Sequence, residues 1–492
     1  MLLMGIDIGT SSIKVSVVDG GSQVCIASAQ YPEFETEIIA PHFGWAEQRP
    51  ELWWENVNQA ILKCNSLKAY NPREISAIGI AYQMHGLVLV DKDQNALRNS
   101  IIWCDSRAVE IGNRAFKEIG AEKCLSHLLN SPGNFTASKL AWVKKNEPEI
   151  YEKIEKILLP GDFIAMKLTG QSTTTVSALS EGIFWDFIKN EISSDILHYF
   201  GFSKEIFPNI VPLFGNHGFL KETVARKLGL KCGISISYKA GDQLNNAFSL
   251  NVMRPGEVAA TAGTSGVIYA VGDKLSSDKK SRINSFAHVN YSWKQPRIGN
   301  LLCINGVGIF NRWIKNLSGE ERSYASLNES AGKIKIGSDG LLALPFGNGA
   351  ERMLENNIIG SHFLNLNFNI HTPSHLARAA QEGIAFSFRY GLDIMKENGI
   401  LPEVIRVGKS NLFLSRVFTD SFVGVTQTVL ELYNNDGSIG AAIGAGIGNG
   451  YFKTEKEAFS GSILLEKIEP NNSEEYEKIY QYWRTELEKR LP

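Results

Sequence analysis

The stretch GIDIGTSSIKVSVVDG, residues 5–20, decides the fold. Apolar residues alternate with small or polar ones on both sides of a Gly-Thr-Ser-Ser turn at 9–12, which is typical of two β-strands joined by a tight bend. The stretch EVAATAGTSGVIYAVGD, residues 257–273, repeats this arrangement with a Gly-Thr-Ser turn at 263–265. A repeat separated by about half the chain predicts a duplicated architecture in which each copy opens one half of the molecule.

Strand and helix patterns alternate through the rest of the chain. Residues 74–91 are strand-like and residues 138–154 have helical spacing, while 375–399 form a long amphipathic helix that Gly399 ends. The patterns that follow are a strand at 403–408, a helix at 415–426, a strand at 428–433 and a Gly/Ala-rich helix at 438–450. This alternation predicts an α/β protein. The length of 492 residues favours two domains, which we place at 1–246 and 247–492.

The composition is that of an ordinary globular protein. The formal net charge is −2, from 50 basic and 52 acidic residues, so neither nucleic acid nor an anionic membrane is indicated as a partner. The six cysteines form no CxxC pair, and reduced thiols are expected. The first residues lack a basic leader, and no apolar run approaches the ~20 residues that span a bilayer. We therefore expect a cytoplasmic protein.

The two glycine-hydroxyl turns are candidate phosphate-binding loops. Glycine lets the backbone approach a phosphate closely, and successive N–H groups and hydroxyls donate hydrogen bonds. An ordinary hairpin turn is the alternative for either turn alone. Their recurrence at matching places in the two halves favours a polyphosphate gripped from both sides. The candidate residues are Gly9, Thr10, Ser11, Ser12, Gly263, Thr264 and Ser265.

Two carboxylates stand out. Asp7 lies inside an apolar strand next to the first turn, where hydrated Mg²⁺ beside phosphate is the natural partner; a turn-capping role is the alternative. Asp242 follows a strand and precedes a helix-like segment, so it should project at the carboxyl end of a sheet, where ligands gather. A kinase that acts on an alcohol needs such a carboxylate to accept the hydroxyl proton. A helix N-cap is the alternative for Asp242.

Candidate substrate contacts follow two further strands. Gln83, Met84 and His85 offer polar groups and an apolar wall that suit a polyol, although a lone histidine at a strand end is often structural. Trp103 and Asp105, with Arg107, could line the same pocket; an aromatic core residue followed by a surface ion pair is the alternative. The Walker loop and GxSxG are absent, and no GxGxxG follows the first strand, which disfavours a dinucleotide fold.

Together these segments resemble the FGGY carbohydrate kinases of the actin-like ATPase superfamily along nearly the whole chain. The matching segments are DIGTSS (7–12), GWAEQRPELWW (44–54), QMHG (83–86), IIWCDSR (101–107), SKLAW (138–142), Gly241-Asp242 and PGEVAATAGTS (255–265). The resemblance implies two actin-like (ribonuclease H-like) domains, with ATP and a sugar meeting in the interdomain cleft.

The resemblance also implies roles for single residues. Asp242 becomes the catalytic base, Asp7 the Mg²⁺-associated carboxylate, and the two turns the phosphate loops. The family's adenosine motif reads Gly408-Lys409-Ser410-Asn411 here, which assigns Gly408 and Asn411 to ATP. Sugar contacts fall to Gln83, Met84, His85, Trp103, Asp105 and Asp242. The Met84–His85 pair favours D-xylulose, phosphorylated to D-xylulose 5-phosphate, because glycerol kinases show Arg-Glu there.

Alternatives remain open. Another sugar kinase of the family would act on ribulose, gluconate or sedoheptulose, and a gluconate enzyme should show a cation near residues 83–86, where the sequence has none. An actin-like ATPase without a sugar pocket would share the two phosphate loops. The oligomeric state is also open, with a homodimer as one alternative.

Overall fold

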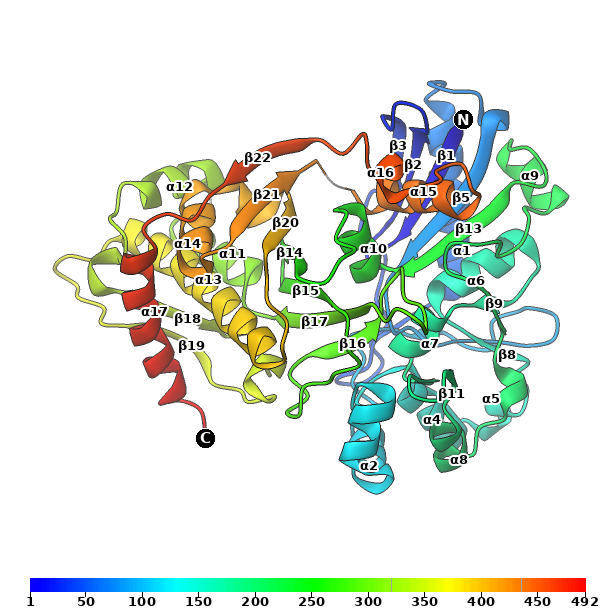
Figure 1. The fold of residues 1–492 in the computed structure, drawn as a ribbon, viewed down its shortest axis with the longest axis horizontal. Helices are drawn as coiled ribbons and strands as arrows, with labels where there is room; N and C mark the ends of the chain where they lie inside the picture. The colour runs from blue at the N-terminus through cyan, green and yellow to red at the C-terminus, as the bar shows by residue number, and fades with distance from the viewer. Residues whose placement is uncertain (320, 435) are drawn as a thin grey trace.

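Two mixed β-sheets organise the molecule. The computed structural model describes residues 1–319, 321–434 and 436–492. In spatial order, the first sheet consists of β13 (Ser235–Gly241), β5 (Ile75–Tyr82), β1 (Leu2–Ile8), β2 (Ile13–Asp19) and β3 (Cys25–Tyr31). The second consists of β16 (Asn284–Ala287), β17 (Ile298–Ile304), β15 (Gly266–Gly272), β14 (Glu257–Ala262), β20 (Val404–Gly408), β21 (Val429–Tyr433) and β22 (Leu464–Ile468). The sheets lie in two halves along the long axis of the molecule (Figure 1).

The same five-stranded arrangement occurs in both sheets. β1 pairs antiparallel with β2, and β2 with β3, whereas β1–β5 and β5–β13 are parallel. In the second sheet β14–β15 and β15–β17 are antiparallel, and β14–β20 and β20–β21 are parallel. Strand order and direction therefore correspond one to one. The predicted α/β class and the predicted repeat are confirmed.

Helices cover both sheets. In the first half they are α1 (Pro50–Ser66), α2 (Val109–Ile119), α3 (Ala121–Lys123), α4 (Thr136–Asn146), α5 (Pro148–Tyr151), α6 (Pro160–Thr169), α7 (Val176–Glu181), α8 (Ser194–Phe200), α9 (Glu222–Leu228) and α10 (Asp242–Ser249). Later in the chain follow α11 (Gly308–Leu317), α12 (Tyr324–Gly332), α13 (Pro373–Glu397), α14 (Arg416–Thr426), α15 (Gly437–Gly448), α16 (Glu455–Ala458) and α17 (Ser473–Glu488). Within the described residues, no helix has both the length and the apolar character needed to cross a membrane.

Short strand pairs complete the structure outside the two sheets. They are β4 (Glu47–Gln48) with β7 (Ser100–Ile101), β6 (Val88–Val90) with β8 (Lys156–Leu158), β9 (Thr173–Thr174) with β12 (Asn209–Ile210), β10 (Trp185–Asp186) with β11 (Glu191–Ile192), and β18 (Leu342–Phe346) with β19 (Gly360–Leu364). Most of them belong to the segments that extend the first half below its sheet in Figure 1.

The alternation of side chains along β1 determines what each face of the first sheet contacts. Met4, Ile6 and Ile8 are buried in one core with residues of α1, α6 and α9. Because successive side chains point to opposite faces, Gly5 and Asp7 lie on the other side. There a Cβ on Gly5 would overlap the backbone of α15, so the helix lies directly on the strand. This close approach brings Asp7 to the beginning of α15.

Helix α15 returns to the first sheet although it follows β21 of the second. It packs against β1, β2, β5 and β13, and Figure 1 shows it over the first sheet, far from β21. Helix α10, which follows β13 of the first sheet, contacts β14, β15 and α15. The division at 246/247 stays a prediction about domains. The structure adds that residues 437–448 belong spatially with the first half.

Two predicted elements are interrupted. The helical pattern at 138–154 is broken because α4 ends at Asn146 and a new helix begins with Pro148, which has no N–H for the preceding turn. The strand-like stretch 74–91 is broken after Tyr82, where His85 adopts a left-handed φ of 62°. The predicted helices and strands between 375 and 450 agree with α13, β20, α14, β21 and α15 to within a few residues.

Candidate active site

Three strands of the first sheet end side by side. The parallel register places Ile8 of β1 and Gly241 of β13 on either side of Tyr82 of β5. The segments that follow these residues are the turn at 9–12, the segment 83–86 and Asp242. Parallel strands collect ligand-binding residues at their carboxyl ends. The register thus brings most of the predicted phosphate and sugar residues of the first half to one edge.

Asp242 begins α10 at this edge. Burial raises its pKa to about 6, and hydrogen bonds from Gln243 oppose the shift in part. Asp242 is the first helical residue, and the N-cap of α10 is Gly241 without a side-chain cap hydrogen bond, so the N-cap alternative for Asp242 is wrong. A carboxyl with this pKa is ionised at neutral pH and still basic enough to take a proton.

Asp7 lies close to two other carboxyl groups. Burial raises its pKa to about 7, the charges of Asp242 and Asp436 contribute to the increase, and Lys14 opposes it. Lys14 Nζ forms an ion pair with Asp436, whose Oδ1 caps α15 by accepting from Ser438 N at 2.9 Å. Buried like charges are relieved by protonation or by a bound cation, and the cation already present, Lys14, is paired with Asp436. The Asp7 environment therefore fits a divalent metal ion.

Asp436 was not predicted from the sequence. It lies after β21 as Asp242 lies after β13, so the two acids occupy corresponding places in the repeated sheets. The only local signal is the Asp-Gly step before the Gly/Ala-rich helix, which is typical of a helix N-cap. Its proximity to Asp7 arises only because α15 crosses back to the first sheet.

Thr10 connects the first turn to two predicted sugar residues. Its Oγ1 accepts a hydrogen bond from Trp103 Nε1 at 2.9 Å and donates one to Gln83 Oε1 at 3.2 Å. Gln48 Nε2 donates to the Thr10 carbonyl at 2.8 Å and Gly9 N to the Ser12 carbonyl at 3.1 Å, which closes the turn. The turn at 9–12 and the predicted sugar residues Gln83 and Trp103 are thus one hydrogen-bonded unit.

The second turn rests on the beginning of α11. Gly308 N donates to the Gly263 carbonyl at 2.9 Å, and Ile309 N donates to the Thr264 carbonyl at 3.1 Å. A Cβ on Gly308 would overlap the Gly263 carbonyl oxygen, so glycine is required for this approach. Thr264 and Ser265 remain exposed, with their hydroxyls available to a ligand.

Two cavities adjoin the second turn. The smaller, about 150 Å³, is lined by Asn246, Ala260, Thr261, Ala262, Gly263, Gly408, Ser410, Asn411, Phe413, Asp436 and Gly437. The larger, about 490 Å³, lies between α11, α12 and the segment 411–415, and it shares Ala262, Gly263 and Asn411 with the smaller one. The structure therefore brings the predicted ATP residues Gly263, Gly408 and Asn411 together. Asp436 and Gly437 connect them to Asp7.

His85 is held in one tautomer. Its Nδ1 lies 3.1 Å from the Glu181 carbonyl oxygen, which can only accept, so Nδ1 bears the hydrogen and Nε2 has a free lone pair. Burial and the charges of Lys139 and Arg352 lower the pKa of His85 to about 3. The Lys139 ammonium also donates to the His85 carbonyl at 3.0 Å. His85 is therefore a neutral hydrogen-bond acceptor. Met84, beside it, packs against Gly241.

Asp105 has buried partners within the protein. Its carboxylate accepts from Ala46 N at 2.6 Å and pairs with Arg107 at 2.7 Å. The Arg107 guanidinium in turn lies 3.7 Å from the Trp45 ring centroid. These contacts agree with the alternative in which Asp105 and Arg107 form an ion pair, except that the pair is buried and not on the surface. Asp105 supports the segment that presents Trp103, and a direct sugar contact stays a prediction.

The expectation that no cation lies near residues 83–86 is wrong. The fold brings Arg352, far away in sequence, close enough to lower the pKa of His85. Its guanidinium carbon lies 5.9 Å from the Phe135 ring centroid, and the Phe135 and His85 rings are 4.9 Å apart. Sequence distance hid this neighbour, since Arg352 belongs to the second half of the molecule.

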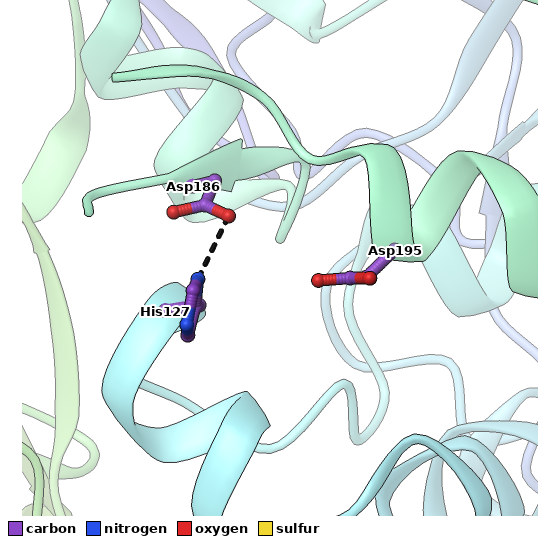
Figure 2. Close-up of side chains that lie close together, drawn as sticks. All are labelled: His127, Asp186 and Asp195. Carbon is purple, nitrogen blue, oxygen red and sulfur yellow. Dashed lines mark hydrogen bonds and ion pairs between the residues drawn. The ribbon is translucent and has the colours of Figure 1, made fainter. Parts of the chain in front are cut away.

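A second group of potential ligand side chains lies outside this site. Figure 2 shows His127, Asp186 and Asp195 with the imidazole turned toward Asp186. His127 Nδ1 lies 2.9 Å from Asp186 Oδ2, and Lys123 pairs with Asp195 at 2.7 Å. Asp186 Oδ1 also accepts from the amides of the turn that follows it. These internal contacts account for the arrangement without a ligand.

Two sheets that share one five-stranded arrangement, with a glycine-hydroxyl turn in each and acidic residues between them, are typical of an actin-like kinase fold. The model of the FGGY family of carbohydrate kinases, N-terminal domain, matches residues 2–249. The chain belongs to this family and is a carbohydrate kinase.

Curated and solved relatives extend the likeness over the whole chain. The chain is 29% identical to the xylulose kinase of Bacillus subtilis over 466 residues, which cover 92% of this chain and 90% of that protein. The solved xylulose kinase of Rhodospirillum rubrum is 25% identical, with a TM-score of 0.88 over 99% of this chain and 98% of its own. The glycerol kinase of Plasmodium falciparum with ADP, 19% identical, shares the fold with a TM-score of 0.89 over 100% and 98% of the two chains.

Proposed function

We propose that this kinase transfers the γ-phosphoryl group of ATP to the terminal hydroxyl of D-xylulose and so forms D-xylulose 5-phosphate. The curated relatives named above are xylulose kinases, and the likeness extends over nearly the full length of both chains. Met84 and His85 stand at the edge that also presents Asp242, as the ketose assignment requires.

The observation on which the mechanism depends is the position of Asp242. It lies at the carboxyl end of β13, with burial raising its pKa to about 6. Asp242 accepts the proton of the sugar hydroxyl as that oxygen attacks the γ-phosphorus, and the bond from phosphorus to the ADP oxygen breaks. Asp7, the other predicted acid at this edge, lies inside β1 and not after its end, which supports Asp242 as the base.

The two turns and the cavities between them bind the nucleotide. The turn at 9–12 and the turn at 263–265 donate backbone N–H groups and hydroxyls to the phosphates, and the segment from Gly408 to Asn411 contacts the adenosine. Asp7, with Asp242 and Asp436 nearby, would hold Mg²⁺, which neutralises phosphate charge. Because these groups come from both halves, closure of the halves completes the site and excludes water.

The sugar-facing residues have defined hydrogen-bonding roles. His85 Nε2 accepts from one sugar hydroxyl, and Met84 provides an apolar wall for the carbon chain. Trp103 is about half exposed and is fixed through Thr10, so it presents its ring without losing its N–H partner. Gln83 positions Thr10 and faces the same pocket.

ADP release measured over a panel of sugars tests the proposal. The wild-type protein is assayed with D-xylulose, D-ribulose, sedoheptulose and D-gluconate, and we expect D-xylulose to have the highest kcat/KM. Asp242→Asn and Asp242→Ala should lose at least 10³-fold in kcat while ATP still binds, because the base and not the nucleotide site is removed. Asp93→Asn, an exposed acid, is the matched control. Near-normal kcat in Asp242→Asn would refute the mechanism, and a different preferred sugar would refute the substrate.

A further inference from the structure

Arg352 is a largely buried cation with no role in the mechanism above. It begins the turn at Arg352–Leu354 in the second half, and its Nη1 donates to Asn284 Oδ1 of β16 at 2.6 Å. Within the part of the chain that the structure describes, no carboxylate lies within ion-pair distance of its guanidinium. Its neighbour Glu351 is occupied by Asn305 N at 3.0 Å, and burial raises its pKa to about 7. A desolvated guanidinium without a counter-ion points to a ligand that accepts hydrogen bonds.

The guanidinium faces the sugar side of the site. It lies near the Phe135 ring, which contacts His85, and the Phe286 ring lies 5.5 Å from His85 on the side of the second sheet. Arg352 therefore approaches the space beside His85 from the opposite half of the molecule, and the charges of Arg352 and Asp242 both act on the Cys303 thiol of β17.

The two halves offer opposite hydrogen-bonding groups to this space. On the first half, His85 Nε2 and the Asp242 carboxylate can only accept. On the second half, the Arg352 guanidinium can only donate. A sugar hydroxyl satisfies either kind of partner, because it both donates and accepts. A ketone oxygen only accepts, so it can be bound by Arg352 and not by His85 or Asp242.

We propose that Arg352 binds the ketone oxygen of the substrate across the cleft and is the residue by which the enzyme selects a ketose over the corresponding pentitol. The proposal rests on the proposed function, since it assumes a ketose in this site. A pentitol has a hydroxyl in place of the ketone and gives the guanidinium a weaker acceptor. Because Arg352 belongs to the second half, this contact also makes sugar binding favour closure.

The test compares D-xylulose with xylitol, which carries two more hydrogens, one on carbon 2 and one on its oxygen. For the wild type, Arg352→Gln and Arg352→Lys, kcat/KM is measured for both sugars, with the xylitol inhibition constant used where turnover is too slow. In Arg352→Gln we expect a loss of about 10- to 100-fold for D-xylulose, as for a charge-assisted hydrogen bond, and under 3-fold for xylitol. Arg352→Lys should recover part of the loss, and KM for ATP should stay unchanged.

The outcomes separate the two claims. Equal losses for both sugars in Arg352→Gln would overturn the ketone assignment. D-Gluconate as the better wild-type substrate, lost selectively in this variant, would show a carboxylate partner and overturn it as well. A wild type that turns over no ketose refutes the proposed function itself. Arg226→Gln, an exposed arginine of α9, controls for loss of charge, and Arg352→Lys controls for folding because it keeps the positive charge.

Discussion

Asp242 and Asp7 lie at the same edge of the first sheet, but different surroundings prepare them for different roles. The pKa of Asp242 is raised chiefly by burial, whereas Asp7 also experiences two neighbouring carboxylates. A base must be deprotonated to act, so kcat/KM should fall about tenfold per pH unit below a pKa near 6. His85, with a pKa of about 3, should contribute nothing above pH 5. A pH–rate profile between 5 and 9 checks this, and a kcat/KM that stays constant down to pH 5 would contradict it.

Asp7→Asn should stabilise the ligand-free protein at neutral pH while it reduces activity. The folded-state pKa of Asp7 is above its unfolded value of 3.8, so ionisation favours the unfolded chain. Stability is therefore lost as pH rises from about 4 to 7, at up to about 1.4 kcal/mol per unit. We expect Tm of the variant to exceed that of the wild type by several degrees at pH 8, with the difference vanishing near pH 4. An unchanged Tm at pH 8 would contradict this account.

The residues that could be predicted from the sequence share one property: their signal is local. The turns at 9–12 and 263–265 and Asp242 are recognisable from the strand that precedes each one. Arg352 and Asp436 were missed because their neighbours come from the other half of the molecule, and neighbouring sequence says nothing of that. Arg352 becomes a candidate for function only when the fold brings it near His85, and Asp436 only when the fold brings it near Asp7.

At the scale of elements, contact between α15 and the first sheet depends on glycine in the strands. A Cβ on Gly79 of β5 would overlap the carbonyl oxygen of Ala441 in α15. Gly79→Ala should therefore push α15 from the sheet, displace Asp436 from Asp7, and cost about 1–3 kcal/mol of stability. Gly332→Ala is the matched control, because its Cβ would meet only Val417 at 3.8 Å. Denaturant unfolding and kcat measure both effects, and equal behaviour of the two variants would refute the expectation.

Element boundaries were harder to predict than the elements themselves. The pattern at 138–154 is amphipathic throughout, yet Pro148 divides it into α4 and α5. The stretch 74–91 is strand-like throughout, yet it breaks at the segment that contacts the substrate in our proposal. His85 has φ of 62° there and is held by a hydrogen bond that its carbonyl accepts from Lys139 and one that its ring donates to Glu181. Tertiary contacts thus override a continuous local pattern at the functional segment.

At the scale of the whole molecule, the two halves exchange helices. α10 contacts β5 and β13 of the first sheet and also β14 and β15 of the second, while α15, which follows β21 of the second sheet, covers β1, β5 and β13. One hydrophobic core accordingly includes Leu3 and Tyr238 of the first sheet, Ala441 of α15, and Tyr269 of the second sheet. Because α15 lies with the first half, no single cut in the sequence separates the two halves of the structure. The repeat can therefore be recognised in the sequence, whereas the boundary between the halves cannot.

This exchange predicts that the first half cannot fold alone. A fragment of residues 1–249 lacks α15, so the face of the first sheet bearing Leu3, Gly5 and Gly79 would be open to solvent and a large apolar surface would be exposed. We expect the fragment to bind the dye ANS, to associate in gel filtration and to unfold without a cooperative transition. Co-expression with residues 250–492 should restore a stable complex and sugar-dependent ADP release, because α15 is then supplied. A monomeric 1–249 fragment with a sharp unfolding transition would show that α15 is dispensable for the first sheet, and the exchange would then matter for catalysis alone.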